Sequence, residues 1–199
     1  MSPGIVSLRG NRARAVFDKL LAEMDAYEWD RVEDVVISQW GKRWKLNYFK
    51  EILHDAGINL SGSVLDLASG AISLAYLYRN TIAIDKDPRC IKELRRNHIK
   101  GAIGDIKELP CEENSFDYVT SFNPELTGHV WSHNGNGVVE IAYDRKFAEQ
   151  LVEVALKIAG KKALIVSYEI SRSPPHPEYI ERRVVEPLYY VVYRPKWKR

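Results

Sequence analysis

Residues 64–70 read VLDLASG and join a short apolar run to a bend of small residues. Apolar side chains on both faces of such a run are typical of a strand that lies buried in a parallel sheet. Ala68, Ser69 and Gly70 then allow the backbone to turn sharply and to approach a ligand closely. The stretch therefore predicts the first strand of an α/β sheet with a candidate binding loop at its end.

Short apolar runs continue along the chain and alternate with segments of helical periodicity. Further strands are predicted at residues 81–85, 102–104, 116–121 and 163–169. The terminal runs RRVVEP and LYYVVYRP predict two more strands joined tightly around Pro187. Strands that alternate with helices form parallel βαβ units. The predicted fold class is a doubly wound, mostly parallel, seven-stranded α/β sheet that ends in an antiparallel hairpin.

Two aspartates mark where helices are expected to begin between the strands. Asp87 precedes Pro88 and a segment that runs to about His98, and Asp144 precedes a periodic segment closed by Gly160. An aspartate at this position can accept a hydrogen bond from a free N–H group of the first turn, and proline suits the first helical residue.

The N-terminal part has a different pattern from the rest of the chain. Residues 11–56 carry apolar side chains at helical spacing, and Gly57 is a suitable stop for the second of two helices. We therefore predict two parts: a helical extension over residues 1–60 that packs on the core, and a binding domain over residues 61–199.

Bulk composition limits the classes of protein to consider. The 199 residues carry a net charge of +2 and contain 45% hydrophobic residues, which is ordinary for a globular domain. No apolar run is long enough to span a bilayer, so no membrane association and a cytoplasmic location are expected. Cys90 and Cys111 predict neither a disulfide framework nor a metal site, and are interpreted as small apolar fillers.

Carboxylates lie at or near the carboxyl ends of three predicted strands. Asp66 lies in the first strand, Asp85 comes 85 − 66 = 19 residues later, and Asp105 follows the third strand. Open α/β sheets bind ligands at the carboxyl ends of their strands, and a carboxylate after the second strand can accept hydrogen bonds from a ribose diol. The pattern therefore predicts a nucleoside site at this edge.

Three blocks together resemble the successive motifs of class I, Rossmann-like S-adenosylmethionine (SAM)-dependent methyltransferases of the small-molecule type (type 11-like). The blocks are VLDLASG, IAIDKDP and GDIKELPCEENSFDYVTS. The last is similar to the signature G-D-x-x-x-L-P-F-x-x-x-S-F-D, with Cys111 in the aromatic position. The resemblance covers residues 62–169 and implies methyl transfer with SAM as the cofactor. Ala68 and Ile72 stand where the family usually has glycine, so a differently shaped loop is expected.

The resemblance also implies roles for particular residues. The loop of Ala68, Ser69 and Gly70 would line the methionyl part of the cofactor, and Asp66 would support both that loop and the methionyl amine. Asp85 would hold the ribose hydroxyls.

The remaining implied contacts surround the adenine and the methionyl group. Lys86 would flank the adenine, Asp105 would accept from its amino group, and the Ile106 N–H would lie beside the ring. Ser121 and Phe122 would border the methionyl group and the transfer site.

The segment 122–143 is the predicted wall of the acceptor site, because it is longer than a simple connection. Glu125 or His129 could take a proton from an acceptor, and the alternative is a surface loop with solvated histidines. A metal held by His129 and His133 would lack a visible third ligand. Asn123-Pro124 partly resembles the Asn-Pro-Pro-aromatic motif of methyltransferases that act on planar amino groups. Glu125 and Leu126 stand where that motif has its second proline and its aromatic residue.

The acceptor itself is not encoded in a visible motif, so several alternatives stay open. A small-molecule acceptor is favoured; a nucleic-acid or protein N-methyltransferase is the alternative, as is a non-catalytic SAM-binding regulatory domain. NAD binding and aminopropyl transfer on the same fold are less well supported. Basic residues of the second helix and the tail are interpreted as an ordinary solvated surface, and only their convergence would favour a nucleic acid. They are Lys42, Arg43, Lys45, Lys50, Arg194, Lys196, Lys198 and Arg199.

Overall fold

The computed structural model describes residues 39–122, 127–130, 140–186 and 188–195. The chain divides into two units, Met1–Lys42 and Arg43–Arg199, and everything below concerns the second. Over the described ranges, no helix combines the length and the apolar character that crossing a membrane requires.

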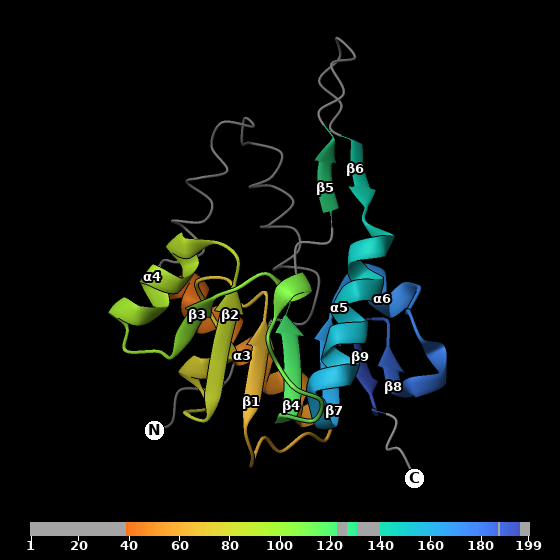
Figure 1. The fold of residues 1–199 in the computed structure, drawn as a ribbon, viewed down its shortest axis with the longest axis horizontal. Helices are drawn as coiled ribbons and strands as arrows, with labels where there is room; N and C mark the ends of the chain where they lie inside the picture. Colours follow the sequence, from red (N-terminus) through yellow and green to blue (C-terminus); the bar gives the residue numbers. More distant parts are fainter. Residues whose placement is uncertain (1–38, 123–126, 131–139, 187, 196–199) are drawn as a thin grey trace, which may run out of the picture. The chain divides into compact units, whose positions relative to one another are not determined.

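A seven-stranded sheet forms the centre of this unit (Figure 1). The strand order is β3-β2-β1-β4-β7-β9-β8, in which the first five strands are parallel and β9 is antiparallel to both of its neighbours. The strands are β1 (Val64–Leu67), β2 (Thr81–Asp85), β3 (Gly101–Ile103), β4 (Phe116–Phe122), β7 (Ala159–Val166), β8 (Ile180–Val184) and β9 (Tyr190–Tyr193). The predicted mostly parallel, seven-stranded sheet with a final hairpin is confirmed.

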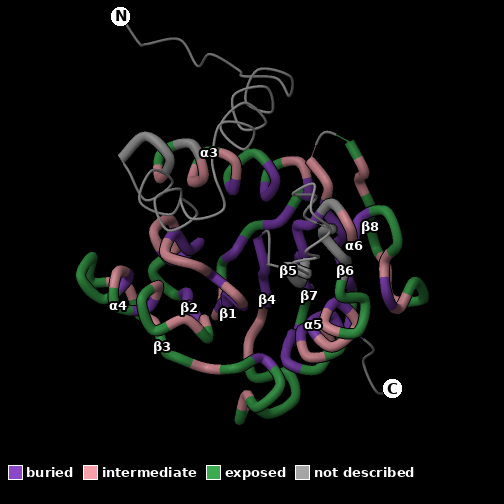
Figure 2. Tube along the Cα trace, turned by 90° about the horizontal axis from the view of Figure 1, so that it is seen from above, coloured by how far each residue is buried: buried purple, intermediate pink, exposed green. Residues whose placement is uncertain are grey.

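The two faces of the sheet are covered by different helices, α3 (Gln39–Asp55) and α5 (Arg145–Ile158), which lie on opposite sides in Figure 2. Successive residues of a strand point to opposite faces. Val64 accordingly belongs to the apolar cluster with α3, whereas Leu65 and Leu67 belong to the cluster with α5. The sheet is therefore buried on both sides, as its apolar strands predict.

The α3 helix is part of the core of this unit. Phe49, Ile52 and Leu53 are at most 2% exposed and pack in the same cluster as strand residues of β1, β7 and β9. The helix ends as predicted before Gly57, whose φ of +62° suits glycine. The predicted boundary after residue 60 stays a prediction, and the compact unit that begins at Arg43 includes most of α3.

Both predicted aspartate caps are confirmed. The Asp87 carboxylate accepts a hydrogen bond from the Arg89 N–H (2.8 Å) at the start of α4 (Pro88–Arg96). The Asp144 carboxylate accepts one from the Phe147 N–H (2.9 Å) at the start of α5. These bonds satisfy N–H groups that have no partner inside a helix.

Two connections differ from the expected pattern. Alternation of strands and helices predicts a helix between β1 and β2, but the chain there forms a single 3-10 turn, η2 (Leu74–Tyr76), because only residues 68–80 separate the two strands. The predicted strand at 163–169 ends at Val166. Ser167 there accepts a hydrogen bond from the Ile170 N–H (3.3 Å) and begins the short helix α6 (Tyr168–Arg172).

The predicted acceptor segment contains a separate two-stranded ribbon. Strands β5 (Thr127–Val130) and β6 (Glu140–Tyr143) pair in antiparallel register, with His129 opposite Ile141. A β-ribbon here was not predicted, although the sequence between the two strands contains Asn134-Gly135 and Asn136-Gly137, dipeptides that are typical of hairpin turns. Residues 123–126 and 131–139 lie outside the described residues.

Polar contacts tie α3 to the C-terminal hairpin. The Tyr190 hydroxyl and the Arg182 guanidinium (3.1 Å) both donate to the Asp55 carboxylate at the end of α3. About two turns earlier in α3, the Tyr48 hydroxyl donates to the Leu188 carbonyl (3.2 Å). The hairpin therefore depends on protonated tyrosine hydroxyls for part of its attachment.

This attachment predicts a loss of stability at alkaline pH. Burial, with Glu51 and Tyr189 nearby, raises the pKa of Tyr48 to about 12. The folded state thus favours the neutral phenol, so its contribution is complete below pH 10 and is lost as the pH rises through 12. We expect Tyr48→Phe to reduce the decline in the free energy of unfolding over this range by up to about 1.4 kcal/mol per pH unit.

Urea unfolding of both proteins between pH 8 and 11 measures this difference. The matched control is Tyr78→Phe, because Tyr78 packs in the same apolar cluster. A Tyr48→Phe variant whose stability declines as steeply as that of the unaltered protein would contradict the prediction.

Candidate functional site

The candidate site lies at the carboxyl edge of the parallel strands, where the segments after β1, β2 and β3 meet. From β1 the next strands are added on one side of the sheet (β2, β3) and then on the other (β4, β7), so the strand order reverses between β1 and β4. Ligands of open α/β sheets bind at such a point. Hydrogen bonds join the Gly70 N–H to Asp85 and the Ser69 N–H to β2, whereas Asp66 accepts from three other residues: Ser73, Leu74 and Thr120.

Asp66 is the most deeply buried carboxylate of this edge, at 1% exposed. One oxygen accepts hydrogen bonds from the Ser73 hydroxyl (2.6 Å) and the Leu74 N–H (3.0 Å), and the other accepts from the Thr120 hydroxyl (2.8 Å). Burial raises the pKa of Asp66, and these three bonds oppose that shift. They join the loop after β1 to β4, which matches the loop-supporting part of the predicted role.

The small-residue loop has an unusual backbone. Ala68 and Gly70 have φ of +48° and +62°, the left-handed region that favours glycine. Ala68 thus holds a backbone conformation that glycine adopts more readily, at a cost of about 1 kcal/mol. The Ser69 N–H donates to the Ile84 carbonyl (3.1 Å), which fixes the loop against β2. Ile72, the other replacement, is buried at 3% exposed.

Asp85 faces this loop from the end of β2. One carboxylate oxygen accepts a hydrogen bond from the Gly70 N–H (2.8 Å), and the other accepts from the Asp87 N–H (2.9 Å). The side chain is half-buried, and each carboxylate oxygen can accept a second hydrogen bond. The arrangement is a fixed pair of acceptors next to a tight backbone turn.

The third strand end is more open. Asp105 is exposed, and one of its oxygens accepts from the Lys107 N–H (2.9 Å) at the start of η3 (Ile106–Glu108). Ile106 is buried in the α5-side cluster, whereas Lys86 is exposed. The Gly104 N–H donates to the Asp85 carbonyl (3.1 Å), so this segment is attached to the end of β2.

The end of β4 supplies one polar and one aromatic side chain. Ser121 is 0% exposed, and among the described residues its hydroxyl has no hydrogen-bond partner. An unpaired buried hydroxyl is costly and points to a missing polar partner. Phe122 packs on Phe49 of α3, with ring centroids 4.1 Å apart. Glu125 lies outside the described residues, and only the backbone of His129 is described.

Lys45 is a residue of this site that the sequence interpretation missed, since it was assigned to a solvated surface. Its ammonium lies 3.8 Å from the place where a Cβ on Gly70 would be. Burial lowers the pKa of Lys45, and Asp66, Cys90 and Asp85 oppose that shift. The signal in the sequence was the spacing of Lys45, Phe49 and Ile52, which places the lysine on the apolar side of α3.

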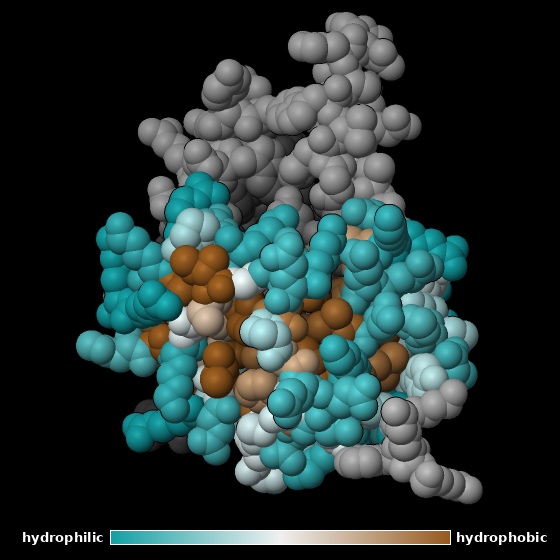
Figure 3. Space-filling model, in the orientation of Figure 1, coloured by the Kyte–Doolittle hydropathy of each residue, from teal (hydrophilic) through white to brown (hydrophobic). Residues whose placement is uncertain are grey.

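Ile103 is a second residue that was missed. It is 57% exposed and pairs in register with Asp85, so both side chains leave the sheet on the same face. Figure 3 shows apolar surface gathered in the middle of the described part, with hydrophilic residues around it. An exposed apolar side chain beside a fixed carboxylate suits a ligand with a flat apolar ring and polar hydroxyls.

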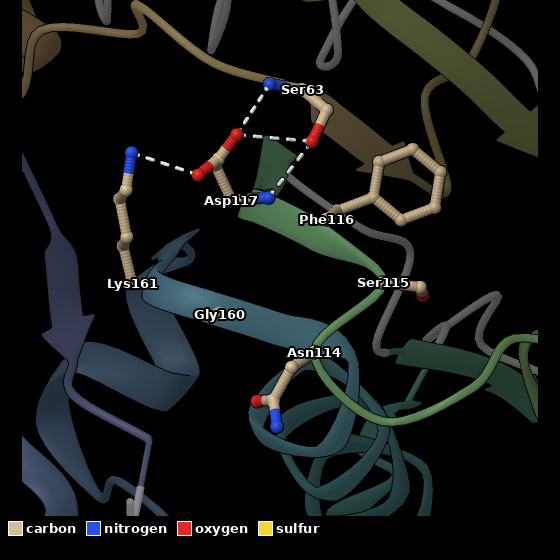
Figure 4. A pocket seen from close by; sticks show the side chains of 7 residues that line it. All are labelled: Ser63, Asn114, Ser115, Phe116, Asp117, Gly160 and Lys161. Carbon is tan, nitrogen blue, oxygen red and sulfur yellow. Dashed lines mark hydrogen bonds and ion pairs between the residues drawn. The ribbon is translucent and has the colours of Figure 1, made fainter.

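A cavity of about 290 Å³ lies at the opposite, amino-terminal edge of the strands (Figure 4). There the Asp117 carboxylate accepts hydrogen bonds from the Ser63 N–H (2.9 Å) and pairs with the Lys161 ammonium (2.8 Å). The hydrogen bond from Lys161, with those from Ser63, lowers the pKa of Asp117. These contacts join β1, β4 and β7, so we interpret this cluster as a structural clamp.

Comparison with known proteins agrees with the geometry. The chain has the Rossmann-like fold of class I SAM-dependent methyltransferases. A structure of the PH0226 protein from Pyrococcus horikoshii is similar over 80% of this chain and 93% of its own, with a TM-score of 0.58 and 16% identity. A putative SAM-dependent methyltransferase from Methanococcus maripaludis is similar over 85% and 93%, with a TM-score of 0.55 and 13% identity.

A Thermoplasma acidophilum protein is similar over 76% of this chain and 85% of its own, with a TM-score of 0.50 and 18% identity. No protein-family model and no curated protein sequence matches the chain. The shared property is therefore the fold, and the predicted resemblance to this class of structure is confirmed.

The hydrogen bonds of Asp66 predict its effect on stability. Asp66→Ala leaves the Ser73 and Thr120 hydroxyls and the Leu74 N–H without their acceptor. We expect the free energy of unfolding, measured in urea at neutral pH, to fall by about 2–4 kcal/mol. Asp105→Ala removes an exposed cap and should cost less than about 1 kcal/mol. Equal effects of the two substitutions would show that the Asp66 network does not hold the loop.

Proposed function

We propose that this protein is a SAM-dependent methyltransferase. The observation that carries the proposal is the hydrogen bond from the Gly70 N–H to the Asp85 carboxylate. It holds a left-handed small-residue turn against an acidic strand end, at the edge where this fold binds nucleosides. Ile103 at the end of β3 is exposed, and the Ser121 hydroxyl near the end of β4 has no hydrogen-bond partner among the described residues, so one apolar and one polar side chain could add contacts.

The residues suit the parts of the cofactor in order along this edge. The loop Ala68–Gly70, supported by Asp66, would hold the methionyl group, and Asp85 would accept from the ribose hydroxyls. At the outer end, the adenine would lie among Lys86, Asp105 and Ile106. Ser121 and Phe122, at the end of β4, would border the transfer site.

The cofactor supplies an activated methyl group, so the chain needs no nucleophile of its own. Its residues must hold donor and acceptor in line, at about 3–3.5 Å, and must exclude water. A base is required only where the acceptor has to lose a proton. We propose Glu125 or His129 for that step, since both follow β4 in the chain.

A small-molecule acceptor is the class we favour. The block GDIKELPCEENSFDYVTS, which is similar to the small-molecule-type group, supports this choice. Lys45 is also not available to a basic nucleic-acid surface, because its ammonium lies beside Gly70. A cytoplasmic location is part of the same proposal.

Cofactor binding tests the site directly. Isothermal titration with S-adenosylhomocysteine should show binding to the unaltered protein. Asp85→Asn should weaken that binding about tenfold or more, because it removes a charge and one acceptor. Asp144→Asn is the matched control, since asparagine also caps helices and the residue caps α5. A protein that binds no S-adenosylhomocysteine, or an Asp85→Asn variant that binds it equally well, would count against the proposal.

The acceptor class can be tested by following the methyl group. The protein is incubated with methyl-labelled SAM and a cell extract that is then separated into small molecules, RNA and protein. We expect label in the small-molecule fraction, and much less of it with Asp85→Asn at limiting SAM. Label in RNA or protein would overturn the small-molecule assignment, and no transfer to any fraction would support a non-catalytic SAM-binding domain.

A further inference from the structure

The Lys45 ammonium is a half-buried cation for which the described part of the chain shows neither a hydrogen bond nor an ion pair. It lies beside Gly70, and its charge is 5.6 Å from the centroid of the Phe49 ring. Burying a cation without a partner is unfavourable. Phe49 compensates part of that cost through the negative face of its ring.

The two nearest carboxylates are already engaged with other groups. Asp66 accepts from Ser73, Leu74 and Thr120, and both oxygens of Asp85 accept from backbone N–H groups. They influence Lys45 through space and favour its charged form. Neither forms a salt bridge with it. The site therefore presents a positive charge next to the loop, with capacity for one further anionic partner.

We propose that Lys45 binds the α-carboxylate of the cofactor's methionyl group and so makes the site selective for a cofactor that carries this carboxylate. The inference rests on the proposed function, in which the loop Ala68–Gly70 lines the methionyl group. That group contains one anion, the carboxylate, together with an ammonium and the sulfonium. A fixed cation beside the loop attracts the first and repels the other two, so it also sets the direction in which the group lies.

The same contact gives a reason why this site would favour methyl transfer over aminopropyl transfer. A decarboxylated cofactor keeps both positive charges and lacks the only group that Lys45 attracts. Its ammonium and sulfonium groups would therefore lie near the Lys45 ammonium with no carboxylate to offset the repulsion between like charges. Specificity of this kind depends on the unfavourable contact with the wrong ligand as much as on the favourable one with the right ligand.

Two ligands that differ in the amino-acid part provide the test. S-adenosylhomocysteine contains the carboxylate, whereas 5′-methylthioadenosine contains the same nucleoside and thioether without it. We expect Lys45→Met to weaken binding of S-adenosylhomocysteine about tenfold or more, and to change binding of 5′-methylthioadenosine by less than about twofold. Methionine keeps an apolar stem over Phe49, and Lys45→Gln is the second variant should methionine disturb folding.

Controls separate this inference from its alternatives. Lys50→Met removes an exposed charge from the same helix and should leave both affinities unchanged. An equal loss for both ligands, or no loss for either, would overturn the role of Lys45, because a structural or general electrostatic effect would not distinguish them. Failure of the unaltered protein to bind either ligand would instead overturn the proposed function itself.

Discussion

The buried carboxylate of Asp66 is the contact on which the site depends. A carboxyl group that is 1% exposed is costly unless its oxygens are hydrogen-bonded, and three donors from two separate segments bond to both of them. The requirement fixes the chain after β1 against β4. With that course set, the loop can hold Ala68 and Gly70 in left-handed conformations and present an N–H group to Asp85. The contacts thus extend from the buried Asp66, through the loop after β1, to Asp85 at the carboxyl edge of the sheet.

Much of the fold could be predicted because parallel strands buried on both faces leave a simple pattern. Apolar runs marked the strands, and aspartates before apolar segments marked the starts of α4 and α5. The same logic predicts that Asp66, Asp85 and Asp105 lie at one edge, since the carboxyl ends of neighbouring parallel strands share it. These inferences needed only local sequence and the regular geometry of a sheet.

What could not be predicted depends on contacts between distant segments. Lys45 lies beside Gly70 because α3 packs on the sheet. Its charge led us to assign it to the solvated surface, although it lies on the apolar side of the helix. Ile103 looked like an ordinary core residue, yet it remains 57% exposed. A 3-10 turn at Leu74–Tyr76 stands in place of a helix because only residues 68–80 connect β1 to β2.

The position of α3 has a consequence for how the molecule can be divided. A fragment that starts at residue 61 matches the extent of the family motifs, but it would leave one whole side of the sheet bare. Phe49, Ile52 and Leu53 would no longer shield the strands, and the hairpin would lose Asp55 as its anchor. Such a fragment would expose a broad apolar surface and aggregate. The smallest autonomous piece must therefore include the part of α3 that covers the sheet.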